Sequence, residues 1–269
     1  MEKDSLRVSI IQTAIVWENR AANLVHYGTL LRQLDGRTDL AVLPELFTTG
    51  SIRDPELADL MEGETASTLK QWAQAYRIAL AGSFMAEENG KYYNRAFFVT
   101  PEGRLFHADK RHLFRAGGED RYLEAGTKRL TVSFRGWNIC LLVCYDLRFP
   151  VWSRNVANAY DLLLYCANWP AVRSDAWRIL LPARAVENQA CVCGVNRTGI
   201  DGAGHAFHGG SALYSPRGEK LADAGDAGEI LLTCTLEKSM LESLRTRFPV
   251  WKDADAFEML PCVPRCPAH

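Results

Sequence analysis

Three residues that could together hydrolyse an amide, Glu45, Lys110 and Cys144, each stand at the end of an apolar strand-like run or hairpin. A thiol becomes a nucleophile when a base takes its proton, and a carboxylate desolvated in a pocket can serve as that base. A nearby lysine stabilises both the thiolate and the oxyanion that forms when sulfur attacks a carbonyl. This set predicts that Cys144 adds to an amide carbon and that Glu45 protonates the departing ammonia. Glu45 then activates the water that hydrolyses the thioester.

Taken singly, each of these residues also has an ordinary structural interpretation. A glutamate after a strand is usually a solvated loop charge or a helix cap, and a lysine within Asp-Lys-Arg is usually a surface charge. A cysteine in an apolar run is usually a small buried hydrophobe, as we expect for Cys140. Cys144 differs from Cys140 because it closes its run and meets charged residues directly. The catalytic interpretation therefore requires that the three side chains meet in the fold.

The stretch from Asn138 to Pro150, NICLLVCYDLRFP, has the pattern of a strand, a sharp turn and a helix. Its branched apolar residues predict a strand buried on both faces, and Pro150 suits the first turn of a helix. A turn of this kind lifts one side chain above the sheet, as in a nucleophile elbow. That side chain is Cys144, and the backbone N–H of Tyr145 would be the second oxyanion donor beside Lys110.

Strand-like and helix-like segments alternate along the rest of the chain. Past the elbow we expect a helix to about Ala159, and we expect the helix at 174–189 to break at Pro182. The polar loop 110–126 is expected to carry function. These elements predict a two-sheet layered α/β domain with helices outside, and a doubly wound single sheet is the competing fold. We predict strands at 6–14, 39–43, 78–84, 92–100, 104–109, 139–143, 161–169, 190–196, 211–215, 219–222 and 229–236, and helices at 19–34, 64–77, 174–189 and 237–248.

Length and composition are those of an ordinary globular chain. The 269 residues are 48% hydrophobic and 23% charged with a net charge of -1, and no basic block indicates a nucleic-acid partner. No run approaches the roughly 20 apolar residues of a membrane span, and the first residues do not resemble a secretory signal, so we expect a cytoplasmic protein with no membrane partner. Most of the eight cysteines lie in apolar runs, which favours reduced thiols. The pairs Cys191/Cys193 and Cys262/Cys266 lack zinc-site spacing, so we expect no metal.

Four motifs in the chain resemble those of the carbon-nitrogen hydrolase (nitrilase) superfamily, and the resemblance spans nearly the whole sequence. The motifs are Pro44-Glu45-Leu46-Phe47, the segment DKRHLF at 109–114, the segment CYDLRFP at 144–150 and the segment ARAVENQ at 183–189. Within the superfamily the chain is most similar to the bacterial omega-amidases of the YafV type. That similarity is carried by DKRHLFRAGGE, CYDLRFPVWSRN, YCANWPAVRS and FPVWKDADAF.

The resemblance implies a role for each matching residue. Glu45 matches the general base, Lys110 the oxyanion lysine and Cys144 the nucleophile. Glu119 matches a second structural or catalytic glutamate, with Glu124 as the less favoured alternative. The implied fold is a four-layer αββα sandwich, a single domain over 1–269 with a short tail at about 261–269. The family implies a homodimer or larger homo-oligomer and no metal or organic cofactor.

The resemblance also implies a substrate, a small keto-acid amide such as 2-oxoglutaramate or 2-oxosuccinamate, cleaved to the acid and ammonia. Arg148 lies near the elbow and could pair with the substrate carboxylate through a bidentate contact; its structural alternative is an ion pair with a neighbour such as Asp146. Trp169 is a candidate pocket wall and Arg173 a second cationic contact. The alternative functions are N-carbamoyl-amino-acid or nitrile hydrolysis, or a catalytically silent scaffold.

Overall fold

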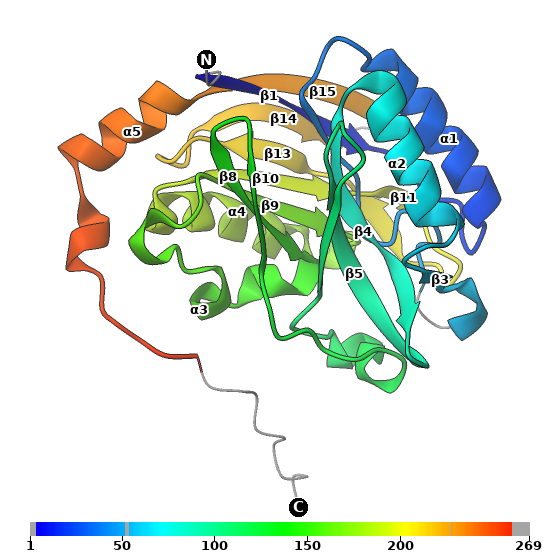
Figure 1. Cartoon of the computed structure of the whole chain (residues 1–269). Coiled ribbons are helices and arrows are strands. Elements are labelled where there is room, and N and C mark those ends of the chain that lie inside the picture. The colour runs from blue at the N-terminus through cyan, green and yellow to red at the C-terminus, as the bar shows by residue number, and fades with distance from the viewer. Residues whose placement is uncertain (1–3, 52–53, 227, 260–269) are drawn as a thin grey trace, which may run out of the picture.

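The computed structural model describes residues 4–51, 54–226 and 228–259, and two β-sheets packed face to face form its centre (Figure 1). The first sheet has the strand order β15-β1-β2-β4-β5-β6, with β3 paired to β4. In this sheet β1, β2 and β4 run parallel to one another. Strand β5 is antiparallel to β4, β6 is antiparallel to β5, and β15 is antiparallel to β1. Its strands are β1 (Ser5–Gln12), β2 (Leu40–Val42), β3 (Asp59–Leu60), β4 (Ala79–Glu88), β5 (Lys91–Val99), β6 (Leu105–Asp109) and β15 (Ile230–Glu237).

The second sheet has the order β14-β13-β10-β9-β8-β7, with β8, β9 and β10 parallel. Its strands are β7 (Leu130–Phe134), β8 (Trp137–Val143), β9 (Leu162–Ala167), β10 (Cys191–Asn196), β13 (Ser211–Tyr214) and β14 (Lys220–Gly225). A separate small hairpin is formed by β11 (Thr198–Ile200) and β12 (Ala206–His208). The strands β3, β11 and β12 have only two or three residues each, too few for the sequence to show a period, and none of them is predicted above.

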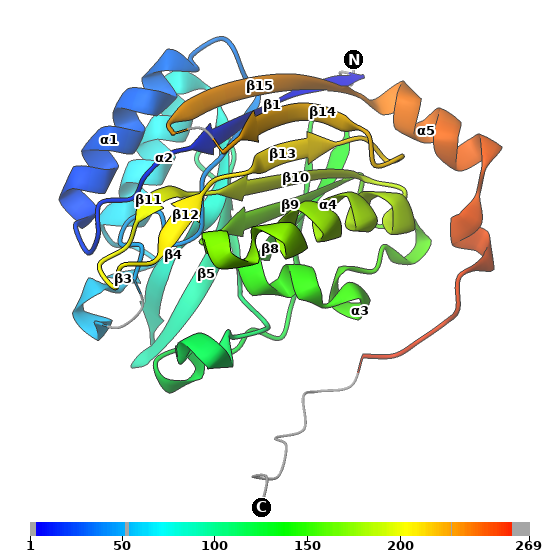
Figure 2. The same cartoon turned by 180° about the vertical axis from the view of Figure 1, so that it is seen from behind.

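Helices cover the outer face of each sheet (Figures 1 and 2). Helices α1 (Arg20–Gln33) and α2 (Glu64–Tyr76) lie on the first sheet, and α4 (Ser174–Asn188), with the short α3 (Pro150–Ser153) beside it, lies on the second. Helix α5 (Lys238–Arg247) follows β15. The layers are therefore helix, sheet, sheet, helix, which is the αββα sandwich, and the competing single doubly wound sheet is wrong. The short 3-10 helices are η1 (Pro55–Leu57), η2 (Arg115–Gly117), η3 (Glu119–Arg121), η4 (Cys144–Arg148), η5 (Val156–Asn158), η6 (Ala171–Arg173) and η7 (Val250–Asp253).

The core has two main parts, one between the two sheets and one between the first sheet and its helices, and residues of the same strand contribute to both. On β5, Ala96 and Phe98 pack between the sheets, whereas Phe97 and Val99 pack towards α1 and α2. Strand side chains point alternately to opposite faces, so a strand buried on both sides contributes to both layers. This explains why the central strands show nearly continuous apolar runs.

The predicted break of the long helix at Pro182 is wrong, because α4 continues through this residue. Proline removes one helical hydrogen bond and normally costs about 3 kcal/mol in a helix interior. The same helix buries Trp177, Leu181 and Ala185 in the core of the second sheet. Burial of three such side chains favours the helix by several kcal/mol in total, which outweighs the local cost.

The helix expected from the elbow to about Ala159 is also wrong in extent. The chain there forms η4, the single turn α3 and η5, with positive φ at Ala157 and Asn158. The Asn155 side chain accepts from the N–H of Tyr160 and donates to the Tyr160 carbonyl, which competes with helical hydrogen bonds. The segment is therefore fixed by side-chain contacts instead of a regular helix.

Two further observations apply to the described part of the chain. None of its helices combines the length and the apolar character that a membrane span requires. Its six cysteines, at 140, 144, 166, 191, 193 and 234, are free thiols. Cys262 and Cys266, with the rest of the tail predicted at 261–269, lie outside the described residues.

Candidate active site

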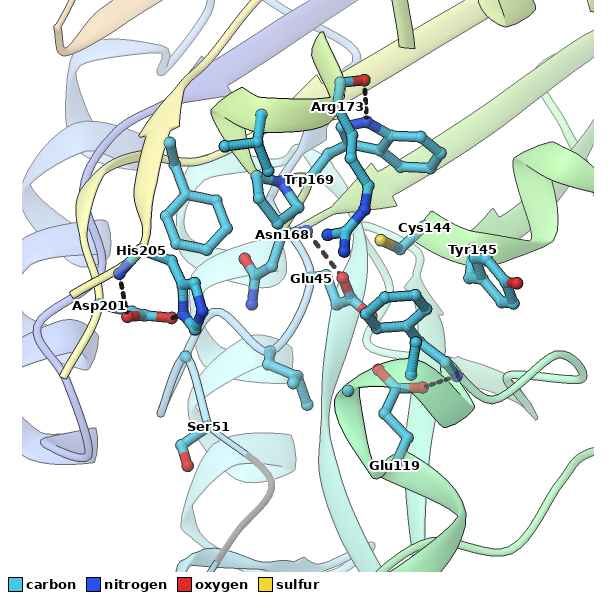
Figure 3. A pocket seen from close by; sticks show the side chains of 18 of the residues that line it. Glu45, Ser51, Glu119, Cys144, Tyr145, Asn168, Trp169, Arg173, Asp201 and His205 are labelled. Atoms are coloured by element: carbon cyan, nitrogen blue, oxygen red, sulfur yellow. Dashed lines mark hydrogen bonds and ion pairs between the residues drawn. The ribbon is translucent and has the colours of Figure 1, made fainter. Parts of the chain in front are cut away.

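The three candidate catalytic residues come from both sheets and meet at the edge of one cavity. Glu45 follows β2 and Lys110 follows β6 in the first sheet, whereas Cys144 follows β8 in the second. The carboxyl ends of parallel strands form one edge of a sheet, which is where open α/β folds bind ligands. The cavity has a volume of about 540 Å³, and Glu45, Glu119 and Cys144 lie in its wall (Figure 3).

Cys144 occupies the sharp turn that the sequence predicts. Its φ is 44°, in the left-handed region that non-glycine residues rarely adopt, so the turn is strained and must be held by its surroundings. Arg184 of α4 provides one support, since its Nε and Nη2 donate to the Leu147 carbonyl at 3.1 and 2.7 Å. The residue is 8% exposed, so its thiol is reached only through the cavity.

Asp146 joins the elbow to the segment that carries Lys110. Its Oδ2 accepts from the N–H of Val143 at 3.1 Å, and its Oδ1 accepts from the N–H of His112 at 3.0 Å. His112 Nδ1 lies 2.7 Å from the same Oδ1, and the His112 ring stacks on Phe149 with centroids 3.7 Å apart. Both oxygens of Asp146 are thus engaged, and in the part of the chain that the structure describes no ion pair joins it to Arg148. The ion pair with Asp146, the example of a structural alternative for Arg148, is therefore not formed among the described residues.

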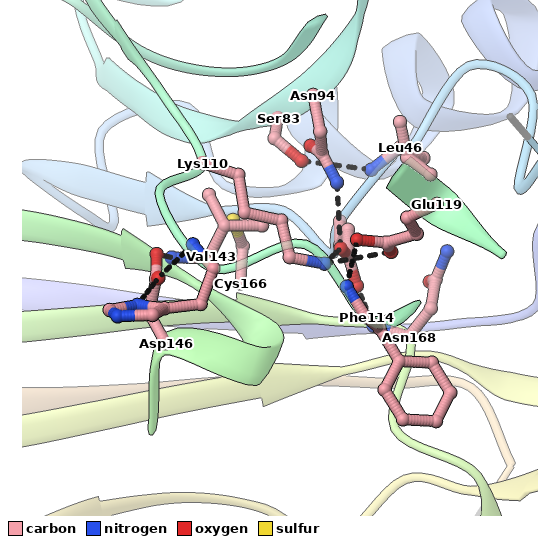
Figure 4. Close-up of polar contacts among 12 residues, drawn as sticks. Leu46, Ser83, Asn94, Lys110, Phe114, Glu119, Val143, Asp146, Cys166 and Asn168 are labelled. Atoms are coloured by element: carbon pink, nitrogen blue, oxygen red, sulfur yellow. Dashed lines mark hydrogen bonds and ion pairs between the residues drawn. The ribbon is translucent and has the colours of Figure 1, made fainter. Parts of the chain in front are cut away.

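A buried cluster of charges that includes Lys110 and Glu119 (Figure 4) interacts with Cys144. Lys110 Nζ donates to Glu45 Oε1 and to Glu119 Oε1, both at 2.8 Å. Glu45 also accepts from the Asn94 side chain at 2.7 Å and, across the two sheets, from the N–H of Asn168 at 2.7 Å. An ammonium group has three N–H donors, and two of them are directed at carboxylates, so the third is left for a reacting oxygen.

Burial and neighbouring charges set the protonation of this cluster. Burial alone would lower the pKa of Lys110, but Glu119 and Glu45 outweigh it and raise this pKa well above the usual range. Burial raises the pKa of Glu119, and Lys110 offsets part of the effect. The pKa of Cys144 is raised well above that of a free thiol by burial and then by Glu45, against the opposing effect of Lys110. The resting site therefore holds a protonated lysine and a protonated thiol.

These shifts lead to a first prediction, that the resting enzyme contains no Cys144 thiolate at neutral or mildly alkaline pH. We expect the ultraviolet thiolate absorbance of the protein minus that of Cys144→Ala to stay flat between about pH 6 and 9, where an ordinary cysteine begins to ionise. The sign follows from the pKa, since a raised value keeps the proton on sulfur. A difference signal titrating near neutrality would mean instead that Lys110 dominates and stabilises a thiolate.

The residues predicted to bind substrate also lie in the cavity wall. The Arg148 guanidinium lies 5.0 Å from the centre of the Trp169 ring, and that of Arg173 lies 4.9 Å from the centre of the Phe114 ring. Trp169 Nε1 donates to the Arg173 carbonyl at 2.7 Å, which fixes the indole as a wall. Within the described residues, neither arginine has a carboxylate within 4 Å. Tyr145 lines the cavity and follows Cys144 in the first turn of η4, where helical N–H groups lack intrahelical partners.

The structure also brings to the site residues for which the sequence predicts no functional role. Asn168 follows β9 just as Cys144 follows β8, so the same end-of-strand rule could have identified it. Asp146 lies inside the motif CYDLRFP, but its contacts with His112 give no local sequence signal. Asp201 and His205 line the cavity from the connection between β11 and β12, a region for which the sequence gives no functional pattern.

Comparisons with known proteins agree with the fold and with the family that the sequence motifs resemble. Residues 7–246 match the carbon-nitrogen hydrolase family. The chain is 42% identical to omega-amidase YafV of Escherichia coli over 254 residues, covering 94% of this chain and 98% of that protein, and 32% identical to a 2-oxoglutaramate amidase of Bacillus subtilis over 252 residues, covering 91% and 96%. The crystal structure of XC1258 from Xanthomonas campestris, a CN-hydrolase superfamily protein with an arsenic adduct in its active site, superposes with a TM-score of 0.92 at 39% identity, covering 95% of this chain and 99% of that one. The chain therefore belongs to the carbon-nitrogen hydrolase family.

Proposed function

We propose that this protein is an omega-amidase that hydrolyses the terminal amide of a small keto-acid amide, of the 2-oxoglutaramate or 2-oxosuccinamate type, to the acid and ammonia. The observation that carries the proposal is the Lys110 ammonium bonded to both Glu45 and Glu119 beside Cys144 at the strained elbow. The similarity to omega-amidase YafV and to a 2-oxoglutaramate amidase supports the substrate class.

In the first half of the reaction Cys144 attacks the amide carbon. Because burial keeps the thiol protonated, Glu45 takes its proton as the carbon–sulfur bond forms. The carbonyl oxygen becomes an oxyanion, which the third N–H of Lys110 and the backbone N–H of Tyr145 stabilise. Glu45 then gives the proton to the amide nitrogen, and the carbon–nitrogen bond breaks. Ammonia departs, and the acyl group remains bound to Cys144 as a thioester.

In the second half a water replaces the departed ammonia. Glu45, again unprotonated, removes a proton from this water as its oxygen attacks the thioester carbon. The same donors stabilise the second oxyanion. The carbon–sulfur bond breaks, the sulfur recovers its proton from Glu45, and the acid is released. Glu119 holds Lys110 in place through its Oε1 while its Oε2 accepts from the N–H of Phe114 at 2.8 Å.

The charge on the cavity wall supports a substrate with a carboxylate. Glu45 and Glu119 share Lys110, and Asp201 is paired with His205 at 3.0 Å, so these wall charges have partners. Arg148 and Arg173 have no acidic partner within 4 Å among the described residues. A guanidinium binds a carboxylate through two parallel hydrogen bonds, so these arginines suit the acid end of the substrate.

The test compares ammonia release by the purified, reduced protein from three substrate classes. We expect turnover of 2-oxoglutaramate or 2-oxosuccinamate to exceed that of N-carbamoyl amino acids and of nitriles by at least about 100-fold in kcat/KM. A nitrile has no carbonyl oxygen for the oxyanion site, and the carbonyl of a carbamoyl group, which lies between two nitrogens, is less electrophilic than that of an amide. Faster turnover of a carbamoyl acid or a nitrile would identify the related hydrolase instead. Absence of turnover on all three classes, together with absence of a covalent acyl adduct, would favour a silent scaffold.

Two features of the biological context belong to the same proposal. We infer a homodimer or larger homo-oligomer, and sedimentation equilibrium of the purified chain measures its size. We also infer a cytoplasmic location, since free thiols such as Cys140 and Cys166 persist in a reducing compartment.

A further inference from the structure

A second polar group faces the cavity across from Cys144, and the mechanism above does not use it. Asp201 and His205 both line the cavity, and both lie in the connection between β11 and β12 (Figure 3). The His205 side chain is 57% exposed and that of Asp201 is 10% exposed. The pair therefore lies where the cavity opens, with the carboxylate covered and the imidazole accessible to a ligand.

The connection that carries this pair is closely packed from behind. A Cβ added at Gly202 would lie 2.3 Å from the Nε1 atom of Trp17, so the backbone rests directly on an indole that also lines the cavity. Phe207 of β12 is backed by the fully buried guanidinium of Arg197, 4.7 Å from its ring centre. Arg197 in turn donates to the Ile15 carbonyl at 2.9 Å. The hairpin is thus anchored to the body of the protein, so its side chains have defined positions.

Asp201 fixes the orientation of the His205 ring. Its Oδ1 accepts from the N–H groups of Ala203 and His205 at 2.9 and 2.8 Å, and its Oδ2 lies 3.0 Å from His205 Nδ1. Burial would raise the pKa of Asp201, but the hydrogen bonds from His205 and Ala203 lower it, so the group is a carboxylate. A carboxylate accepts, so Nδ1 carries the proton and Nε2 is directed away from Asp201 and is available to a ligand.

We propose that His205, oriented by Asp201, is a substrate-positioning residue whose Nε2–H binds the acid end of the amide substrate while Cys144 attacks the other end. The inference rests on the proposed function and deepens it. Donation to two carboxylates requires the imidazolium form of the ring, whose two N–H groups then contact Asp201 on one side and the substrate carboxylate on the other. The arginines on the elbow side and His205 on the hairpin side then hold the acid end from two directions.

The experiment measures KM and kcat for two substrates of similar length, glutaramate, which has a carboxylate, and butyramide, which has none. For His205→Phe we expect the KM for glutaramate to rise about 10- to 100-fold, the range for loss of one hydrogen bond to a charged group, with kcat changed less than about threefold. Kinetics on butyramide should stay within about threefold of wild type. His205→Gln, which restores a donor, should recover part of the loss, and Asp201→Asn should fall between wild type and His205→Phe.

His208→Phe is the matched control, because His208 is exposed on the same hairpin but does not line the cavity. Its kinetics on both substrates should equal those of wild type. A second readout is independent of turnover: in the Cys144→Ala background, His205→Phe should weaken calorimetric binding of glutarate by a similar factor. Equal increases in KM for both substrates, or an unchanged KM with a reduced kcat, would overturn the positioning role. A wild-type enzyme that hydrolyses no acid amide would instead overturn the proposed function.

Discussion

Replacing Cys144 with alanine is expected to lower amide turnover by about 10⁴-fold or more, because among the described residues no other thiol lines the cavity and the covalent thioester cannot form. The other thiols nearby are enclosed in the core, and burial raises the pKa of Cys140 to about 11. Alanine keeps the Cβ of cysteine, so the strain of the positive φ at the elbow is unchanged and the variant should fold. Ammonia release measures the loss, and intact-mass spectrometry should detect an acyl adduct on the wild type alone.

Cys140→Ala is the matched control for this loss. Cys140 lies on β8 four residues before the elbow and is fully buried. Its replacement should reduce the free energy of unfolding by about 1 kcal/mol and leave the turnover per folded enzyme unchanged. Turnover in Cys144→Ala above a few per cent of wild type would contradict the assignment of the nucleophile. A loss in Cys140→Ala as large as that in Cys144→Ala would contradict it as well.

The elbow shows how much of this site the sequence could predict. The branched apolar run predicts a strand, the change to polar residues at its end predicts a turn, and Pro150 predicts the start of a helix. The structure has a strand, a strained turn at Cys144 and a helical turn at these positions. The end of the expected helix near Ala159 was wrong because Asn155 bonds to the backbone of Tyr160, a contact that no periodicity reveals. Local pattern thus predicts how an element begins better than where it ends.

The contacts that bring the two sheets together could not be predicted in this way. Glu45 accepts a hydrogen bond from the backbone N–H of Asn168, which is 123 residues further along the chain. This contact exists only once the two sheets pack together. The same is true of Asp201 and His205, whose place at the cavity depends on Arg197 and Trp17 behind the hairpin. The strands that flank these two residues are too short to give a pattern, so the sequence does not predict a role for them. Tertiary packing, and not propensity, determines these positions.

Replacing Lys110 with methionine is expected to have the second largest effect, a loss of kcat of about 10³-fold together with a loss of stability of about 3 kcal/mol. Methionine keeps much of the length of the side chain but removes the charge and all three donors. The oxyanion then loses one stabilising group, which accounts for the activity. Glu45 and Glu119 are left facing each other without the cation that both now contact at 2.8 Å, which accounts for the stability.

A second substitution separates the two effects. Adding Glu119→Gln to Lys110→Met removes one of the two like charges, so urea unfolding should show a recovery of about half of the lost stability, whereas kcat should not recover. Lys91→Met is the control, because Lys91 forms an exposed pair with Glu124 at 3.6 Å and should change the free energy of unfolding by less than about 1 kcal/mol. Recovery of kcat in the double variant would show that Lys110 acts only by neutralising carboxylates.

The stabilisation by Lys110 should also depend on pH in one direction. The folded pKa of Lys110 lies above its unfolded value of about 10.4, so the contribution is full below that pH and is lost as the pH rises through the folded value. The difference in unfolding free energy between wild type and Lys110→Met should therefore be constant from neutral pH to about pH 9 and shrink only at strongly alkaline pH. A difference that already shrinks below about pH 9 would mean that Lys110 loses its proton in the folded cavity, and a neutral amine there could not serve as the cation that the proposed oxyanion site needs.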